Sequence, residues 1–341
     1  MERTHSCCFV TSLDSDIAAI FIMAYRLLVC LQEEGMQEKT LERPITCSGI
    51  GLHSGQKVSL GFYPLPAGSG VMWSIKGNAG VRLLEINPQH VVDTTLCTTI
   101  GQDDVRVGTV EHVMAAIRGM GIDNILVEVN GPEVPIMDGS AASFVHLFHQ
   151  AGLRDQHRQK MVYVVTQTVH MQEQGKSITV QPDHVFRVKY TIDFPHPMVG
   201  RQKMQFVLGG TDFVQELARA RTFGFLSDVK ALQNQGMALG GSLENALVFD
   251  QTGAINSDGF RFPNEPVRHK ILDLIGDIGL LPHPVLGCFD VHCSGHALNT
   301  AFAGHLFENK EKYLRLVALK DFRKWRKETR MPAANPCTAP A

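Results

Sequence analysis

Residues 268–277, late in the chain, place several chemically capable groups on one side of a predicted helix. At about 100° per residue, His269, Asp273, Gly276 and Asp277 fall on one face. The apolar side chains fall on the opposite face: Val267, Ile271, Leu274, Ile275 and Ile278. An imidazole and a carboxylate one turn apart point the same way, and the glycine leaves room for another group to approach the backbone. This pattern predicts a ligand site, although a solvated polar face with a helical ion pair fits it as well.

Two further clusters could complete such a site. Glu111 and His112 are adjacent at the start of a predicted helix, and His296 precedes another. Two histidines and one carboxylate are a common ligand set for catalytic zinc, which keeps a fourth position for water. The ion lowers the pKa of that water to about 7, and a glutamate beside a ligating histidine is placed to take its proton. A second histidine could protonate a leaving amine, with Asp277 holding its charge. A glutamate in a first helical turn could also simply favour the helix dipole.

The elements that must position these groups follow from the local patterns. The glycine-rich residues 45–55 look like a phosphate-binding loop, but residues 57–63 alternate like a strand, so a hairpin is predicted and a nucleotide cradle is not. Residues 94–99 (TTLCTT) predict a β-branched strand whose hydroxyl edge could line a polar cavity. Thr109 is the predicted N-cap of a helix over residues 110–117.

Composition bounds the function classes. The 341 residues are 44% hydrophobic and 19% charged, with a formal net charge of −2. These values describe a globular protein that is long enough for two domains. The balanced charge gives no pull toward nucleic acid, and no nucleic-acid-binding motif is present. Eight cysteines without a C-x-x-C pair argue against a zinc ribbon or a disulfide framework and suit a reducing cytosol.

The predicted elements run as strands followed by helices, twice, which is typical of the α+β class. Strands are expected at residues 57–63, 71–75, 81–86, 124–129, 161–169, 177–181, 185–192, 246–249 and 285–291. No residue-level repeat accompanies this repeated order. We predict domain I over residues 36–156, a linker near residues 154–160 and domain II over residues 157–308.

The two ends are expected to lie outside these domains. Residues 1–35 are interpreted as an extension that is not part of the fold. Their apolar stretch is too short to span a bilayer, and it makes a poor signal peptide because no basic segment precedes it. Met36 offers a second plausible start. Residues 309–341 are predicted to form a basic C-terminal tail, as a solvated helix or as an amphipathic segment in weak contact with a membrane surface. The tail is expected to be disordered after Met331.

Seven short motifs, in order and with matching spacing, resemble the UDP-3-O-acyl-N-acetylglucosamine deacetylases of lipid A synthesis (LpxC). They are residues 51–55 (GLHSG), 109–112 (TVEH), 134–140 (VPIMDGS), 219–225 (RARTFGF), 239–245 (LGGSLEN), 269–273 (HKILD) and 294–299 (SGHALN). The resemblance runs from about residue 36 to residue 299. It implies two similar domains, each a small β-sheet with helices, with the helices packed between the two sheets.

The resemblance also implies roles for particular residues. The implied metal ligands are His112, His269 and Asp273, with Zn²⁺ as the cofactor and Fe²⁺ as a possible replacement in the cell. Glu111 matches the general base. The remaining matches are His296 as general acid or electrostatic partner, Asp277 as its support, Thr222 as a hydrogen-bond donor to the oxyanion, Lys270 as a substrate-binding residue, and Phe223 with residues 227–238 as the passage for an acyl chain. Many relatives have arginine where Ser227 stands here, which affects only contacts at the mouth of that passage.

The reaction that the resemblance implies is zinc-dependent hydrolysis of the N-acetyl group of UDP-3-O-((R)-3-hydroxyacyl)-N-acetylglucosamine. The implied partner is this acylated UDP-sugar, and the enzyme is expected to be a cytoplasmic monomer. Two alternatives stay open at this point. A zinc amidase for another acylated sugar or peptide would keep the metal ligands without the acyl passage, and a non-catalytic binding module would keep the metal but not need Glu111.

Overall fold

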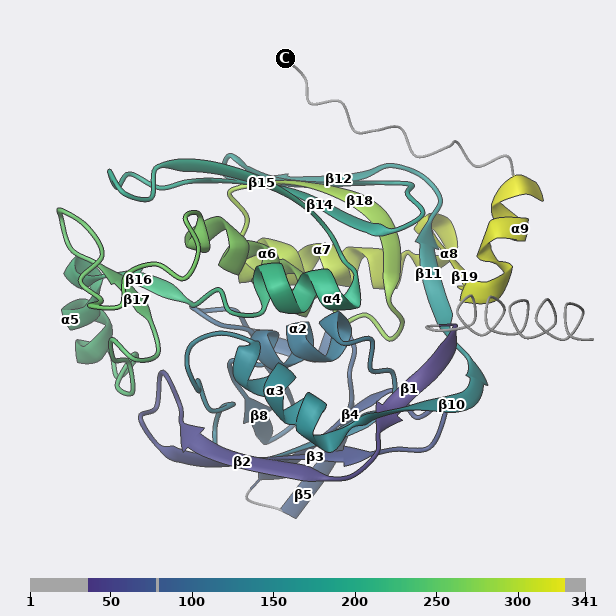
Figure 1. Ribbon diagram of the computed structural model, residues 1–341, viewed down its shortest axis with the longest axis horizontal. Coiled ribbons are helices and arrows are strands. Elements are labelled where there is room, and N and C mark those ends of the chain that lie inside the picture. Colours follow the sequence, from purple (N-terminus) through teal and green to yellow (C-terminus); the bar gives the residue numbers. More distant parts are fainter. Residues whose placement is uncertain (1–35, 78–79, 329–341) are drawn as a thin grey trace, which may run out of the picture.

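The structure, a computed structural model, describes residues 36–77 and 80–328. Two β-sheets face each other across a layer of helices (Figure 1). This confirms the predicted α+β class with helices packed between two sheets. The interpretations of residues 1–35 and of the residues after Met331 fall outside the described part of the chain.

The first sheet is built from residues of the first half of the chain. Its strands, in spatial order, are β2 (Ile45–Ile50), β3 (Lys57–Pro64), β9 (Ile125–Asn130), β4 (Val71–Gly77) and β5 (Gly80–Glu85). Only the β4–β9 pair is parallel; the other pairs are antiparallel. Alternate side chains such as Leu60, Phe62 and Trp73 are buried beneath the helices, as expected for a sheet with one covered face. Beside this sheet lies a small one of β6 (Val91–Asp93), β7 (Thr99–Gln102) and β8 (Val105–Val107).

The second sheet comes from the second half of the chain. Its strands are β11 (Met161–Val165), β12 (Val169–Glu173), β13 (Lys176–Gln181), β14 (Phe186–Asp193), β15 (Arg201–Val207), β18 (Val285–His292) and β19 (Leu314–Ala318). β18 is central: it pairs with β11 and β14 in parallel and with β13 in antiparallel fashion.

The helices between the sheets are α2 (Glu111–Gly119), α3 (Ala142–Ala151), α6 (Glu265–Ile278) and α7 (His296–Glu308), with a short turn α4 (Gly210–Asp212) that continues as a π-helix over Phe213–Leu217. Figure 1 shows α2 and α6 in the middle of this layer, one from each half of the chain. A Cβ atom added at Gly276 of α6 would collide with the carbonyl oxygen of Glu111. The room left by Gly276 is therefore filled by the backbone of α2 and not by a ligand, as its place on a polar face had suggested.

Replacing Gly276 by alanine is expected to lower the free energy of unfolding by about 1–3 kcal/mol, because the added methyl group overpacks the α2–α6 contact. Urea denaturation measures this loss. Gly304→Ala in α7 is the matched control, since its added Cβ has no described atom within 4 Å. This control should be neutral or stabilising by up to about 1 kcal/mol, following helix propensity. Equal effects of the two substitutions would contradict the close contact at Gly276.

Two parts of the chain differ from the sequence-based prediction of their structure. The predicted linker near residues 154–160 is instead strand β10 (Leu153–Gln159), which pairs with β1 (Gln37–Leu41). The start of the predicted tail is not one solvated helix. It contains the short helix α8 (Lys310–Tyr313), which is followed by strand β19, and this strand pairs with β11 at the edge of the second sheet. Only α9 (Phe322–Glu328) has the expected basic helical character.

Two local predictions near the centre of the molecule were also wrong. Residues 94–98 do not form a strand, because the chain turns there with Leu96 in the left-handed region at φ +64°. Thr109 is not an N-cap: its φ is +59°, and its hydroxyl group donates to the buried Glu133. Helix α2 begins two residues later, at Glu111.

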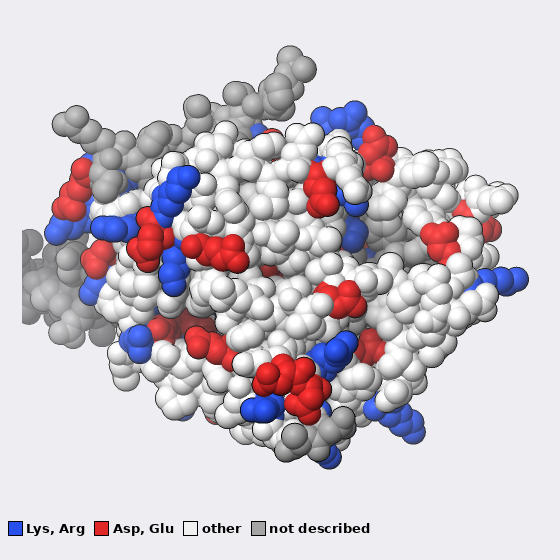
Figure 2. Space-filling view, turned by 180° about the vertical axis from the view of Figure 1, so that it is seen from behind, with Lys and Arg blue, Asp and Glu red and all other residues white. Residues whose placement is uncertain are grey.

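A lobe at one end of the molecule carries β16 (Phe223–Phe225), α5 (Leu226–Asn234) and β17 (Leu247–Phe249) (Figure 1). It projects beyond the two-sheet body and holds an aromatic cluster that includes Phe223, Phe225 and Phe249. On the face seen in Figure 2, acidic and basic side chains are interspersed. Within the described residues, no helix combines the length and apolar character needed to cross a bilayer.

Candidate metal centre and active site

Helix α6 presents His269, Asp273 and Asp277 at successive turns of one face, and all three are buried. Pro266 occupies its first turn, where a missing N–H costs nothing. His269 Nδ1 lies 3.0 Å from the carbonyl oxygen of Ala220. With Nδ1–H as donor, the Nε2 lone pair points away from Ala220 toward Asp273, and this is the usual way that a second partner orients a ligating histidine.

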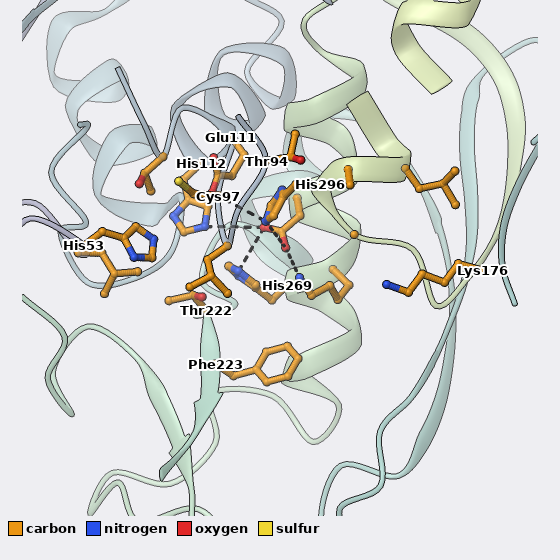
Figure 3. A pocket seen from close by; sticks show the side chains of 18 of the residues that line it. His53, Thr94, Cys97, Glu111, His112, Lys176, Thr222, Phe223, His269 and His296 are labelled. Atoms are coloured by element: carbon orange, nitrogen blue, oxygen red, sulfur yellow. Dashed lines mark hydrogen bonds and ion pairs between the residues drawn. The ribbon is translucent and has the colours of Figure 1, made fainter. Parts of the chain in front are cut away.

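Helix α2 brings His112 to the same point from the other half of the chain. The Nε2 atoms of His112 and His269 lie 3.7 Å and 3.2 Å from Asp273 Oδ1. The two rings meet edge-on, with centroids 5.0 Å apart (Figure 3). One ligand atom from each of these three buried residues lies within 4.8 Å of the other two, which is the arrangement that a single bound cation requires.

The chemistry of these three groups fits a divalent metal ion. Asp273 is 1% exposed, and its Oδ1 has no hydrogen-bond partner among the described residues. An ionised oxygen left in this state is costly unless a cation pairs with it. Burial and the neighbouring His269 lower the pKa of His112 to about 3, and burial also lowers the pKa of His269. Both imidazoles are therefore neutral, as metal ligands must be.

The pKa of Asp273 is well below its usual range. Burial alone would raise it, but Lys270 and His269, which is protonated at the low pH where Asp273 titrates, outweigh that effect. Lys270 Nζ lies 2.8 Å from Asp273 Oδ2, so one carboxylate oxygen is paired with an ammonium group and the other faces the two imidazoles. Two nitrogen ligands and one carboxylate oxygen match a catalytic zinc site with an open position.

A third histidine, His296, closes the other side of the site. His296 Nδ1 lies 3.0 Å from Asp277 Oδ2, and its Nε2 lies 3.9 Å from Asp273 and 4.0 Å from Glu111. Burial would lower the pKa of His296, but the charges of Asp277 and Glu111 outweigh burial and raise the pKa to about 9. His296 is therefore a cation near neutral pH, with Nε2–H directed into the site.

Glu111 is the first residue of α2 and lies near both His112, from the first half of the chain, and His296, from the second half (Figure 3). It is 3% exposed. Burial, together with the nearby charges of Asp277 and Asp273, raises the pKa of Glu111 to about 7 even though His296 acts in the opposite direction. A carboxylate with a pKa near the working pH is well suited to exchange a proton with water.

These groups open onto a cavity of about 470 Å³. Its lining includes Glu111, His112, His269, Asp273 and His296, together with Thr94, Cys97, Lys176, Thr222, Phe223 and Lys270. The sequence analysis singled out most of this set, and the fold brings it together from six separate segments. Burial raises the pKa of the Cys97 thiol to about 12, so this thiol is protonated and inert near neutral pH.

A second, largely apolar cavity of about 410 Å³ adjoins the first and runs into the lobe. Both cavities share Leu52, His53, Leu96, Thr222, Phe223 and Lys270. Phe223 stands at this junction, with its ring centroid 6.4 Å from that of His269 and 5.9 Å from Lys270 Nζ. Helix α5 supplies Leu226, Val229 and Leu232 to the far wall. Val229 and Leu232 fall in the segment from which an apolar passage was expected, and Leu226 directly precedes it.

Comparison with known proteins identifies the group to which this architecture belongs. The sequence matches the family described as LpxC: UDP-3-O-acyl N-acetylglycosamine deacetylase over residues 38–308. The chain belongs to this family. It is 49% identical to the UDP-3-O-acyl-N-acetylglucosamine deacetylase of Nitratidesulfovibrio vulgaris over 284 residues, covering 83% of this chain and 92% of that protein.

Two more deacetylases of the family show the same extent of similarity. The enzyme of Oleidesulfovibrio alaskensis is 48% identical over 286 residues, covering 84% of this chain and 94% of its own length. That of Neisseria meningitidis is 41% identical over 287 residues, covering 82% and 93%. The family assignment made from the seven motifs is confirmed.

Some groups in this deacetylase-family site were not found from the sequence. Thr98 and Asn299 are fully buried and both bond to Asp277. The hydroxyl-rich run at residues 94–99 and the motif SGHALN contained them, but neither pattern predicts a contact between segments so far apart. His53 is a third case: it lines both cavities, and its ring nitrogens have no hydrogen-bond partner among the described residues.

Proposed function

We propose that this chain is a zinc-dependent UDP-3-O-acyl-N-acetylglucosamine deacetylase. It hydrolyses the 2-acetamido group of UDP-3-O-((R)-3-hydroxyacyl)-N-acetylglucosamine to acetate and the free amine, an early committed step of lipid A biosynthesis. The observation that carries the proposal is the unpartnered Asp273 Oδ1 facing two neutral imidazoles, beside a raised-pKa carboxylate and a cationic histidine. Family membership and the adjoining apolar cavity agree with this substrate.

In this scheme His112, His269 and Asp273 hold the metal. When bound, the ion acts as a Lewis acid and makes water nucleophilic near neutral pH. Glu111 accepts the proton of the attacking water, a role that typically contributes about 10²–10⁴-fold. His296, held by Asp277, donates a proton to the leaving amine.

Two residues complete the scheme by contacting substrate. The Thr222 hydroxyl group donates to the oxyanion of the tetrahedral intermediate, and this kind of stabilisation is largest in a water-poor site. Lys270 binds the polar part of the substrate. Phe223 and the cavity wall formed by α5 take up the acyl chain, whose burial stabilises binding by about 0.8 kcal/mol per methylene group.

A deacetylation assay on the UDP-acyl-sugar, run with and without a chelator, tests the proposal. We expect turnover that is abolished by chelation and restored by Zn²⁺, with Fe²⁺ as a second active metal. A substrate analogue without the acyl chain should lose at least 10²-fold in kcat/KM, since about 1.4 kcal/mol corresponds to tenfold. Equal turnover of both substrates would instead favour a zinc amidase for some other acylated molecule.

The pH dependence follows from Glu111 and His296. Glu111 must be ionised to accept a proton, so the rate rises as the pH passes its pKa, and His296 must be protonated to donate, so the rate falls above its pKa. The protein's own groups raise these pKa values to about 7 and about 9. A bound cation favours the carboxylate and disfavours the imidazolium, so we expect a bell-shaped profile with both limbs at or below these values.

Profiles of kcat/KM against pH for Glu111→Gln and His296→Gln assign the limbs. The first variant should lose the acidic limb and the second the alkaline limb. An alkaline limb that persists unchanged in His296→Gln would contradict the assignment of the acid.

We propose that domain I covers residues 36–156 and domain II residues 157–308. Strand β19, which follows domain II in the chain, completes the second sheet by pairing with β11. The protein is proposed to be a cytoplasmic monomer.

Helix α9 makes at most weak contact with an anionic membrane surface. It carries the basic residues Arg323, Lys324, Arg326 and Lys327 beside stacked Phe322 and Trp325. Co-sedimentation with anionic and neutral vesicles tests the membrane contact, and sedimentation equilibrium tests the monomeric state.

A further inference from the structure

Thr98 lies where the two halves of the site meet, and hydrogen bonds connect it to both halves. Its backbone N–H donates to Glu111 Oε2 at 3.0 Å, and its hydroxyl group donates to Asp277 Oδ1 at 2.6 Å. Its carbonyl oxygen accepts from the N–H of Val110, 3.2 Å away, immediately before α2. The residue is completely buried.

The departure from strand geometry at residues 94–98 makes this possible. In a strand, the N–H group of Thr98 would lie in the plane of the sheet and its side chain would stand perpendicular to it. Because the chain turns at Leu96, whose φ is +64°, the amide and the hydroxyl group of Thr98 both reach acidic side chains of the site. One residue therefore bonds to a carboxylate on α2 and to a carboxylate on α6.

The hydroxyl group has one proton, and its short distance to Asp277 shows where that proton goes. A hydroxyl-to-carboxylate distance of 2.6 Å is typical of a charge-assisted hydrogen bond. The contact of the same oxygen with His296 Nδ1 is longer, at 3.4 Å. His296 Nδ1–H is thus free to donate to Asp277 Oδ2, which also accepts from Asn299 Nδ2 at 2.9 Å.

Asp277 consequently receives donors on both of its oxygens, and within the described part of the chain Thr98 is the one donor to Oδ1. Asn299 is held in turn by Ser294, whose hydroxyl group lies 2.6 Å from Asn299 Oδ1. The α7 side of Asp277 is therefore fixed by its own neighbours. Thr98 is the link that ties this assembly to the side of the site that carries Glu111.

We propose that Thr98 is a positioning residue that fixes Asp277, and through it His296, relative to Glu111. Thr98 touches neither substrate nor metal in this proposal. Its hydroxyl group sets the orientation of the proton donor, and its amide sets that of the proton acceptor. The inference rests on the proposed deacetylase function, because it assigns a role within that reaction.

The hydroxyl group can be removed without changing the backbone bonds by Thr98→Val, which keeps the shape of the side chain. We expect kcat to fall by about 10–100-fold, a loss of the size seen when a group that orients residues of a metal site is removed. KM, bound zinc per chain and the melting temperature should stay close to those of the wild type. Thr98→Ser keeps the hydroxyl group and should retain kcat within about threefold.

Thr99→Val is the matched control, because it removes a neighbouring hydroxyl group whose contact is with Cys97 Sγ at 3.8 Å. A double variant with Asp277→Ala tests whether Thr98 acts through Asp277. If it does, Thr98→Val should lower kcat much less in that background than in the wild type, as expected for residues that act as a unit.

The outcomes separate this inference from the proposed function. Wild-type protein without deacetylase activity would overturn the function itself. An active wild type with kcat of Thr98→Val within threefold of normal, a loss carried by KM or by zinc content, or a loss of the same size in Thr98→Ser would overturn the role of Thr98 alone. Should Thr98→Val fold poorly, full additivity of Thr98→Ala with Asp277→Ala would overturn it equally.

Discussion

Replacing Glu111 by glutamine should lower kcat for deacetylation by about 10²–10⁴-fold, the contribution of a well-placed general base. Glutamine has nearly the same shape, and its side-chain oxygen can still accept the N–H of Thr98, which lies 3.0 Å from Glu111 Oε2. The variant loses only the ability to take a proton from water. His112 and Asp273 are unchanged, so about one zinc ion per chain should remain bound.

Steady-state kinetics and metal analysis on the same sample measure the two expectations together. Glu128→Gln is a suitable control, because this exposed carboxylate lies on β9, outside the two cavities, and contacts Tyr63. It should behave as wild type. Turnover by Glu111→Gln within tenfold of wild type would remove Glu111 from the reaction, and loss of zinc would assign it to metal binding instead.

Replacing either α6 ligand should release the metal, with a loss of activity at least as large. His269→Ala removes one of two nitrogen ligands, and Asp273→Asn removes the only anionic one. We expect zinc affinity to fall by more than 100-fold, beyond the 10–100-fold typical for losing a group that merely orients a ligand. In Asp273→Asn, the partly buried ammonium group of Lys270, 2.8 Å from Asp273 Oδ2, also loses its counter-charge, which adds repulsion against the cation.

Competition with a fluorescent zinc chelator gives the affinity of each variant. His149→Ala is the control for histidine loss, since this residue is exposed at the end of α3. Full zinc affinity in both His269→Ala and Asp273→Asn would contradict their assignment as ligands. A loss in only one of them would mean that the ion sits elsewhere in the cavity.

Sequence reasoning worked best where chemistry and spacing lie within one helix. The polar face of α6, with His269, Asp273 and Asp277 at successive turns, is visible from helical periodicity alone. Ligand chemistry suggested Glu111 and His112 as companions of that face, and motif resemblance then assigned their roles. Nothing in the local pattern specifies which helix packs against which. Gly276 carried this information, but its partner could be identified only once α2 was in place.

The errors share a physical cause: local propensity was overridden by contacts from distant parts of the chain. Residues 94–98 have β-branched character but turn inward, because Thr98 satisfies two buried carboxylates. Thr109 has the right side chain for an N-cap but bonds to Glu133 instead. Residues 153–159 and 314–318 become strands only because β1 and β11 offer them edges to pair with.

The proposed reaction depends on one metal ion held by side chains from both halves of the chain, and anomalous X-ray diffraction at the zinc absorption edge tests this most directly. Crystals grown with Zn²⁺ should give one strong anomalous peak between the Nε2 atoms of His112 and His269 and Asp273 Oδ1. A peak of that strength at another place, or no peak among these three residues in zinc-loaded active enzyme, would contradict the account.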